Sequence, residues 1–391
     1  MHYCLRVATW HFSISESLII EDIKKIGDRM DKTIIREKID LLGKAFEKVF
    51  DFKNDEEFLK RIAGLDEVNK EKVLRFKKWD WIHGVGLYGY WKIYEFTKDK
   101  TYFQLLETYY EERTREGLPE KNINSVCPLL VLTYLYEVKP KEEYLEIIKE
   151  WSNWIMEELP KTKEGGFQHI TSESDNKGQL WDDTLFMTVL FLARAGVLLQ
   201  NTSYIEEAKY QFLIHIKYLV DRETGLWYHG WTFEKGHNFA KALWARGNCW
   251  ITIAIPELIE ITNMEDGAVK RFLVEALKKQ VHALKNFQDD SGLWYTIINE
   301  KDNYVEASGS AGCAYGILKA INAGLIEDEY LEVAVKPLEK LIGFIDQEGL
   351  VHQVSIGTPM GETVEFYKQI GIEPMPYGQA LMMLYLIELL K

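Results

Sequence analysis

The stretch KYLVDRETGLWYHGW, residues 217–231, decides how this chain folds, because its Gly-Leu-Trp-Tyr core (225–228) recurs at residues 292–295. Related tetrapeptides stand at 166–169 (Gly-Phe-Gln-His) and 349–352 (Gly-Leu-Val-His). The four glycines are 59, 67 and 57 residues apart. Each copy follows a segment with apolar residues three and four positions apart and precedes a polar loop and another helical segment. Each unit is therefore predicted to be a helical hairpin with one turn at a constant place.

A repeat of about 60 residues divides the 391-residue chain into roughly six hairpins. Six hairpins can close into a ring, and the apolar character of residues 181–196 suits an inner helix that is covered on all sides. We therefore predict an all-α fold, an (α/α)6 barrel of six helical hairpins with short strands or turns in the rim loops. An open solenoid is the alternative. Residues 1–50 lack the turn pattern and are predicted to form an N-terminal helical extension, with the barrel as one catalytic domain at 51–391.

Local features of two inner segments carry further predictions. In WARGNCWITIAIPELIEI (244–261), Asn248 is interpreted as the N-cap of the following helix, and Pro256 predicts a kink or an end of that helix. Asp182 and Asp183 stand at the start of another apolar helix. Acidic residues there favour the positive end of the helix dipole, which explains one aspartate more readily than two.

The composition excludes several classes of function. Hydrophobic residues make up 47% and charged residues 28%, as in a globular protein, while a formal net charge of -14 argues against a nucleic-acid partner. Four scattered cysteines fit a reducing compartment. We find neither a signal-peptide pattern nor an apolar run of about 18 residues. We therefore expect a cytoplasmic protein without a membrane partner and without a metal or other cofactor; its oligomeric state is not indicated.

The predicted rim collects aromatic, polar and charged side chains, and twelve tryptophans in one chain is a high count. Indole faces match the C–H faces of sugars, while carboxylates, amides and imidazoles can bind hydroxyl groups. A carbohydrate site is the economical interpretation, although each of these residues taken alone also has a purely structural explanation. The candidate residues are Trp81, His83, Asn124, His169, Trp181, Asp183, His229, Trp244, Arg246 and Trp250.

Two motifs in this set resemble a known family. The block Trp-x-Asp-x-Leu-(Phe/Tyr)-Met at 181–187 and the block Trp-x-Arg-Gly-Asn-x-Trp at 244–250 are similar to those of glycoside hydrolase family 105, the unsaturated rhamnogalacturonyl hydrolases. The unsaturated glucuronyl hydrolases are more distant relatives. The resemblance covers roughly residues 75–391. It implies an (α/α)6 barrel that removes a 4,5-unsaturated uronic acid from the non-reducing end of an oligosaccharide.

The resemblance also implies roles for single residues. Asp183 matches the catalytic acid, which protonates C4 of the enol-ether double bond before water adds at C5. Asp182 falls on a variable position and is predicted to start the helix or to support its neighbour. Arg246 and Trp250 match residues of the uronate site, with Trp244 beside them, and His169 and His229 match loop histidines. Trp181, Trp81 and His83 complete the expected substrate contacts, and Asn124 stands where the family carries a second aspartate.

Three other functions stay open at this point. A hydrolase of saturated glycosides would pair Asp183 with Asp80 or Glu306 across a water molecule. A zinc enzyme of the lanthionine-cyclase type would use His229 with Cys249 and Cys313, but Tyr228 stands where a thiol would be needed. A noncatalytic sugar-binding toroid would bind the same oligosaccharide without consuming it.

Overall fold

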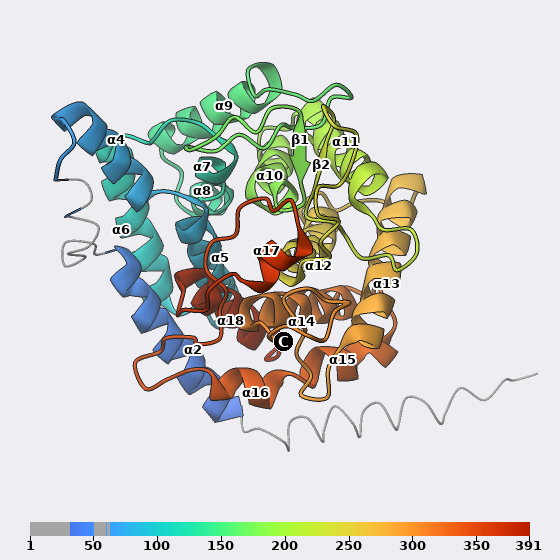
Figure 1. The fold of residues 1–391 in the computed structure, drawn as a ribbon. Coiled ribbons are helices and arrows are strands. Elements are labelled where there is room, and N and C mark those ends of the chain that lie inside the picture. The colour runs from blue at the N-terminus through green and yellow to red at the C-terminus, as the bar shows by residue number, and fades with distance from the viewer. Residues whose placement is uncertain (1–31, 51–59, 61–62) are drawn as a thin grey trace, which may run out of the picture.

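The computed structural model describes residues 32–50, 60 and 63–391. Within these residues six apolar helices form an inner ring in which each helix contacts the next (Figure 1). Because the last helix of the ring contacts the first, the ring is closed, and the open solenoid is excluded. The inner helices are α5 (Trp81–Thr97), α8 (Leu129–Val138), α10 (Leu190–Leu198), α12 (Ala245–Ile261), α14 (Ala307–Asn322) and α18 (Pro376–Glu388).

An outer layer of helices covers this ring: α6 (Lys100–Glu116), α9 (Glu142–Glu157), α11 (Thr202–Leu219), α13 (Ala268–Phe287), α15 (Leu331–Val335) with α16 (Leu338–Gly343), and α2 (Lys32–Glu47). Of these, α2, α11, α13 and α15 each pack against one inner helix, while α6 and α9 each contact two neighbouring inner helices. The outer helices are amphipathic: α9 buries Tyr144, Ile148, Trp151 and Ile155, which lie three and four residues apart on one face. The predicted (α/α)6 barrel is therefore confirmed.

Helix α2 lies inside the segment that we assigned to an N-terminal extension. It packs against α18 and buries an apolar face, so within the described residues it is the outer partner of the sixth hairpin. The hydroxyl of Tyr90 on α5 also donates a hydrogen bond to the carbonyl oxygen of Gly43 at 2.7 Å. The boundary at residue 50 stays a prediction, and residues 1–31 of the predicted extension lie outside the described residues.

The repeated turn corrects our alignment of its first copy. Gly225, Gly292 and Gly349 have φ angles of +83°, +87° and +82°, and in the first copy Gly165, at +79°, adopts this conformation. We had aligned Gly166 instead. Only glycine enters this left-handed region without strain, so backbone conformation decides the register. With Gly165 as the reference, His169 and His229 occupy the same position in successive hairpins.

Asn248 is not an N-cap, which is a second correction. Helix α12 begins at Ala245, and Asn248 lies inside it. Its side-chain oxygen accepts a hydrogen bond from the backbone nitrogen of Trp227, and its amide nitrogen donates to the carbonyl oxygen of Trp227, both at 2.8 Å. Asn248 therefore ties a repeated turn to an inner helix. Pro256 also lies inside α12, which continues beyond it rather than ending there.

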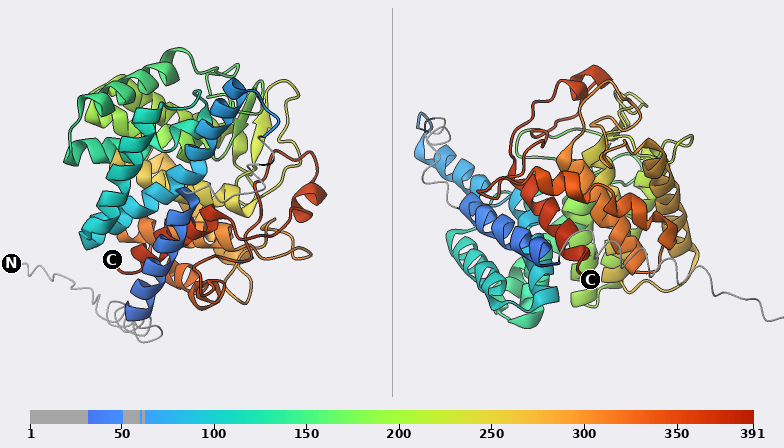
Figure 2. Two further views of the ribbon diagram at one scale, coloured as in Figure 1. Left: turned by 90° about the vertical axis from the view of Figure 1, so that its left-hand side faces the viewer. Right: turned by 90° about the horizontal axis from the view of Figure 1, so that it is seen from below.

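Each inner helix begins at the end of the barrel where the long loops lie (Figure 2). The positive ends of the inner-helix dipoles therefore face this rim. No helix in the described part of the chain is long and apolar enough to cross a membrane. The rim carries short elements: the antiparallel strands β1 (Gln179–Trp181) and β2 (Gly230–Thr232), the π-helical turn η2 (Leu185–Val189), α4 (Glu67–Lys78), α7 (Ile123–Val126) and α17 (Val364–Lys368), while η1 (Lys48–Phe50) follows α2 and η3 (Asp328–Tyr330) precedes α15.

Candidate active site

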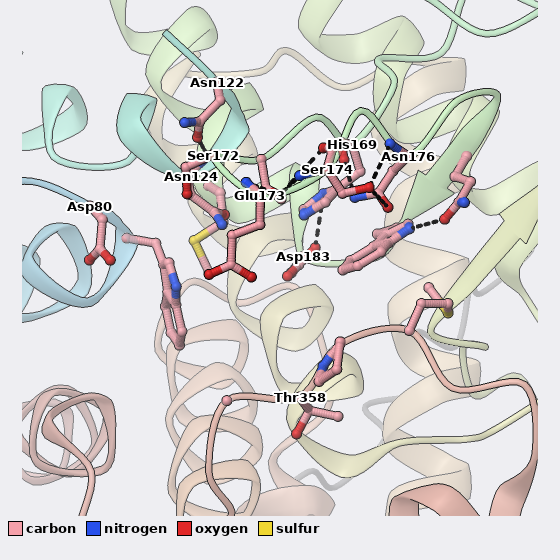
Figure 3. A pocket seen from close by; sticks show the side chains of 18 of the residues that line it. Asp80, Asn122, Asn124, His169, Ser172, Glu173, Ser174, Asn176, Asp183 and Thr358 are labelled. Atoms are coloured by element: carbon pink, nitrogen blue, oxygen red, sulfur yellow. Dashed lines mark hydrogen bonds and ion pairs between the residues drawn. The ribbon is translucent and has the colours of Figure 1, made fainter. Parts of the chain in front are cut away.

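The rim encloses a cavity of about 630 Å³ (Figure 3). The structure brings most of the predicted site residues to its wall and leaves two of them, His83 and His229, outside the lining. The predicted residues that line the cavity are Trp81, Asn124, His169, Trp181, Asp183, Trp244, Arg246 and Trp250.

The two adjacent aspartates have different surroundings. Asp183 lines the cavity with 17% of its side chain exposed. Asp182 is fully buried, and neither of its carboxylate oxygens has a hydrogen-bond partner among the described residues. It lies so close to Gly247 that a Cβ atom there would be 2.1 Å from Asp182 Oδ2. β1 and η2 flank the pair on either side, so neighbouring residues face different surroundings.

Burial decides the protonation of both carboxyl groups. It raises the pKa of Asp183 to about 7, although the positive charge of Arg246 acts in the opposite direction. Burial, followed by the charge of Asp183, raises the pKa of Asp182 well above its ordinary value. Asp183 can therefore carry a proton near neutral pH, and burial likewise favours the protonated form of Asp182.

His169 sits directly beside Asp183. Its Nδ1 lies 2.7 Å from Thr184 Oγ1 and 3.4 Å from Asp183 Oδ1. Its ring stacks on Trp181 with a centroid distance of 4.2 Å. Burial, assisted by the neighbouring His229, lowers the pKa of His169 well below its usual value. A neutral imidazole, stacked on Trp181, thus lies beside the Asp183 carboxyl group.

His229 lies behind the wall rather than in it. Its ring packs against Trp181 and Trp244, at centroid distances of 5.3 and 4.4 Å, and its Nδ1 lies 2.7 Å from the Tyr367 hydroxyl. Burial lowers its pKa to about 3, with a smaller effect from Arg246. His229 therefore supports two indoles that face the cavity.

Arg246 lines the cavity and also holds part of its wall. The guanidinium donates hydrogen bonds to the carbonyl oxygens of Ser355 and Ile356 at 2.8 and 3.0 Å and to Thr358 Oγ1 at 3.0 Å. It also lies 3.8 Å from a carboxylate oxygen of Glu306. Arg246 therefore combines a structural role, beside the cap of α14, with a place in the cavity wall.

The Arg246 guanidinium and the aromatic rings around it form one layer at the floor of the cavity. The guanidinium carbon of Arg246 lies 4.7 Å from the ring centres of both Trp244 and Tyr377. Trp81 stacks on Tyr377 at 4.9 Å and meets Trp250 edge to face at 6.2 Å. This arrangement presents flat apolar faces beside a positive charge, which suits a sugar that carries a carboxylate.

The start of α5 places one more carboxylate in the cavity. Asp80 lines it and caps the helix by accepting a hydrogen bond from the backbone nitrogen of Ile82 at 2.8 Å. His83 is buried behind it, with Nδ1 3.5 Å from Asp80 Oδ1 and its ring stacked against Tyr109. Of the two partners considered for Asp183 in a saturated-glycoside hydrolase, Asp80 therefore shares the cavity.

Glu306, the other possible partner, is fully buried and does not line the cavity. Its carboxylate accepts hydrogen bonds from the backbone nitrogens of Ser308, Gly309 and Ser355 at 3.1, 2.5 and 2.9 Å, so it serves as the cap of α14. Over the residues that the structure describes, no group of three His, Cys, Asp or Glu side chains is placed to hold a metal ion.

Two loops line the cavity that we did not single out from the sequence. Residues 171–174 with Asn176 come from the connection before β1, and their run of small polar residues is the only local signal that they face a ligand. Residues 357–360 with Glu362 come from the segment before α17. No sequence pattern links the second segment to Asp183, because Arg246 and the barrel closure bring it there. Asn122, the N-cap of α7, also lines the cavity beside Asn124.

A closed ring of six helical hairpins with a protonatable aspartate, an arginine and several indoles at one rim defines a carbohydrate-active hydrolase. The family model for Glycosyl Hydrolase Family 88 matches residues 56–391, and the chain belongs to this family of glycoside hydrolases. The family resemblance and enzyme class expected from the sequence are thus confirmed.

Individual relatives agree with this placement. The chain is 32% identical to the unsaturated rhamnogalacturonyl hydrolase YesR of Bacillus subtilis strain 168 over 84% of its own length and 94% of that protein. It is 25% identical to an unsaturated 3S-rhamnoglycuronyl hydrolase of Alteromonas sp. strain LOR, over 64% and 63% of the two chains. A crystal structure from Klebsiella pneumoniae MGH 78578, a possible member of GH105, is 40% identical with a TM-score of 0.86, covering 92% of this chain and 93% of that one.

Proposed function

We propose that this protein removes a 4,5-unsaturated uronic acid from the non-reducing end of an oligosaccharide, with Asp183 as the catalytic acid. One observation carries the proposal: burial raises the pKa of Asp183 to about 7 at the wall of a cavity that also contains Arg246. A carboxyl group that keeps its proton near neutral pH can deliver it to carbon. The names of the relatives in Bacillus and Alteromonas agree with this reaction class.

The proposed reaction uses one carboxyl group twice. Asp183 donates its proton to C4 of the C4–C5 double bond, and the ring oxygen stabilises the positive charge at C5. Water adds to C5 and returns a proton to the Asp183 carboxylate. The C5 hemiketal opens by breaking its bond to the ring oxygen, which leaves a ketone at C5. The former ring oxygen stays on C1 as the hydroxyl group of a hemiacetal. This hemiacetal collapses to an aldehyde and releases the leaving sugar as an alcohol, so one water is consumed for each glycosidic bond cleaved.

The surroundings of Asp183 support this sequence. Because one carboxyl group suffices, an amide at Asn124 in place of a second aspartate is compatible with turnover; it can hold a hydroxyl group or the attacking water. The substrate carboxylate would lie near Arg246 and the positive ends of α10 and α12. Its negative charge would offset the effect of Arg246 on Asp183 and favour the protonated acid. His169, neutral and 3.4 Å away, would orient the Asp183 carboxyl group.

A panel of unsaturated disaccharides from pectin, glycosaminoglycan and ulvan lyases tests the proposal. The enol-ether double bond absorbs ultraviolet light, so turnover removes absorbance while releasing a reducing sugar. We expect loss of absorbance with at least one disaccharide and no loss with the Asp183→Asn variant. Bleaching by that variant at the wild-type rate would refute the role of Asp183.

The same assay separates the alternative functions. A hydrolase of saturated glycosides, with Asp80 and Asp183 in the same cavity, would release sugar from saturated substrates and leave the unsaturated chromophore intact. A noncatalytic toroid would bind the unsaturated disaccharide without bleaching it. Activity that is lost with a chelator and restored by zinc would favour the zinc enzyme instead.

The compartment and the partners belong to the same proposal. Cys127, Cys249 and Cys313 are free and buried, which agrees with the reducing cytoplasm that we expect for this protein. The proposed partner is the unsaturated oligosaccharide itself.

A further inference from the structure

We propose that Glu173 selects against a negatively charged leaving sugar, so that the residue next to the unsaturated uronic acid must be neutral. This inference rests on the proposed function and adds the chemical class of the leaving group. Glu173 belongs to the loop between the first repeated turn and β1. Figure 3 shows its side chain pointing from this loop into the cavity that holds Asp183 and Asn124.

Glu173 stands where the cavity continues outward. A second hollow of about 420 Å³ adjoins the first, and the two share residues 171–174, Phe76 and Asn122 in their walls. The floor of the first cavity, with Arg246, offers room for the uronic acid. The leaving sugar would then occupy the outer part, between the loop of Glu173 and Phe76.

Among the described residues, positive charge in the inner cavity is confined to one residue, and the carboxyl groups of Asp80, Asp183, Glu173 and Glu362 line the same cavity. Arg246 is the only cation that lines the inner cavity within the described residues. The outer hollow contains Glu120, Lys121, Glu173 and Asp175. The net charge of this outer hollow therefore depends on whether Lys121 is already paired with an acidic residue outside it.

Ion pairs neutralise two of the four outer charges. Lys121 pairs with Glu150 at 2.8 Å, and Glu120 pairs with Lys72 at 2.8 Å. In the described part of the chain, no cation lies within ion-pair distance of Glu173. Asp175 likewise has no cationic partner there, so the unpaired charge of the outer wall is negative.

This charge distribution orients and filters the substrate. The uronate carboxylate is attracted to the floor, where Arg246 and the helix N-termini supply positive charge. A sulfate or carboxylate on the leaving sugar would face Glu173 at a separation below the Debye length of about 8 Å and be repelled. The loop also offers Ser172, Ser174 and Asn176, which can bind the hydroxyl groups of a neutral sugar.

The test compares two substrates that differ only in charge: the unsaturated uronyl-rhamnose 3-sulfate released by an ulvan lyase, and the same disaccharide after desulfation. Glu173→Gln removes the charge and keeps the shape of the side chain. Glu223→Gln is the matched control, because Glu223 is exposed, does not line either hollow and changes the net charge equally.

We expect the wild type to have a kcat/KM at least about tenfold higher for the neutral disaccharide, the size of one screened like-charge contact in a partly solvated cleft. Glu173→Gln should remove most of this difference by accelerating the sulfated substrate, while Glu223→Gln should not. Added salt should narrow the gap in the wild type and leave it unchanged in Glu173→Gln, a response that a purely structural role would not produce.

Three results would overturn the inference. The wild type could cleave both disaccharides equally, Glu173→Gln could slow both equally, or the two glutamine variants could behave alike. If the wild type bleaches no unsaturated disaccharide of any kind, the proposed function fails together with the inference, and that outcome is distinct from the other three.

Discussion

Replacing Asp183 by asparagine should abolish turnover and stabilise the protein at the same time. In the proposed mechanism this acid donates a proton in the first step, so the variant should lose about 10²–10⁴ in kcat, the usual contribution of a general acid. In the wild type, the pKa near 7 predicts that kcat/KM falls tenfold per pH unit above about pH 7, because only the protonated acid reacts.

The stability effect follows from the same pKa. Folding raises the pKa of Asp183 from an ordinary 3.8 to about 7, a difference of about three pH units. A carboxyl group with a raised pKa in the folded state stabilises that state at low pH and loses this contribution as pH rises from about 4 to about 7. At 1.36 kcal/mol per pH unit, burial of the ionisable group costs about 4 kcal/mol by pH 8, and asparagine avoids this cost.

Urea unfolding of wild type and variant at pH 4 to 8 measures this difference together with the altered titration of Asp182, whose pKa the charge of Asp183 raises. We expect the free energy of unfolding of the variant to gain on that of the wild type as pH rises, while a pH–rate profile of the wild type gives the same apparent pKa. A pH-independent difference in stability, together with an acid that titrates near pH 4 in the kinetics, would refute the reasoning.

Three further substitutions probe the floor of the site and the opposite end of the barrel. Asp182→Asn should leave the apparent pKa near 7 in the pH–rate profile, because burial raises the pKa of Asp183 and Arg246 opposes it, without a contribution from Asp182. Gly247→Ala should lower kcat and the melting temperature, since its Cβ would meet Asp182 Oδ2 at 2.1 Å; an unchanged melting curve would contradict the packing. Glu257→Gln should cost about 1–3 kcal/mol in urea unfolding at pH 7, because Lys319 and Lys92, at 3.4 and 3.9 Å, lose this buried counter-charge and keep only their more exposed partners Glu260 and Glu95. Burial alone would raise the pKa of Glu257, but the two lysines lower it to about 2, so its contribution should persist above pH 4.5 and disappear between pH 4.5 and pH 2.

Local patterns in the sequence were sufficient to predict the architecture and most of the candidate residues that line the cavity. The repeated turn depends on glycines whose backbone conformation no other residue adopts cheaply, and helical periodicity marks the segments between them. The motifs around Asp183 and Arg246 hold their residues within one loop or one helical turn. Residues within each motif are therefore close in space because they are close in the sequence.

Other features depended on contacts between distant segments. Asparagine is a common N-cap residue, yet α12 begins three residues before Asn248. The Asn248 side chain instead bonds the backbone of Trp227, in a repeated turn 21 residues earlier in the chain. The wall at 357–360 reaches the site because Arg246 bonds a segment about 110 residues further along the chain. Neither periodicity nor motif spacing reports such pairings.

The sequence by itself determined the six-hairpin fold and the family, because these follow from local backbone preference and short motifs, and it predicted Asp183 as the acid. Only the tertiary structure decided that Asp183 keeps its proton near neutral pH and that Glu173 faces the outer cavity. Both depend on how much water and which charges surround a side chain, and those surroundings are assembled from loops far apart in the chain.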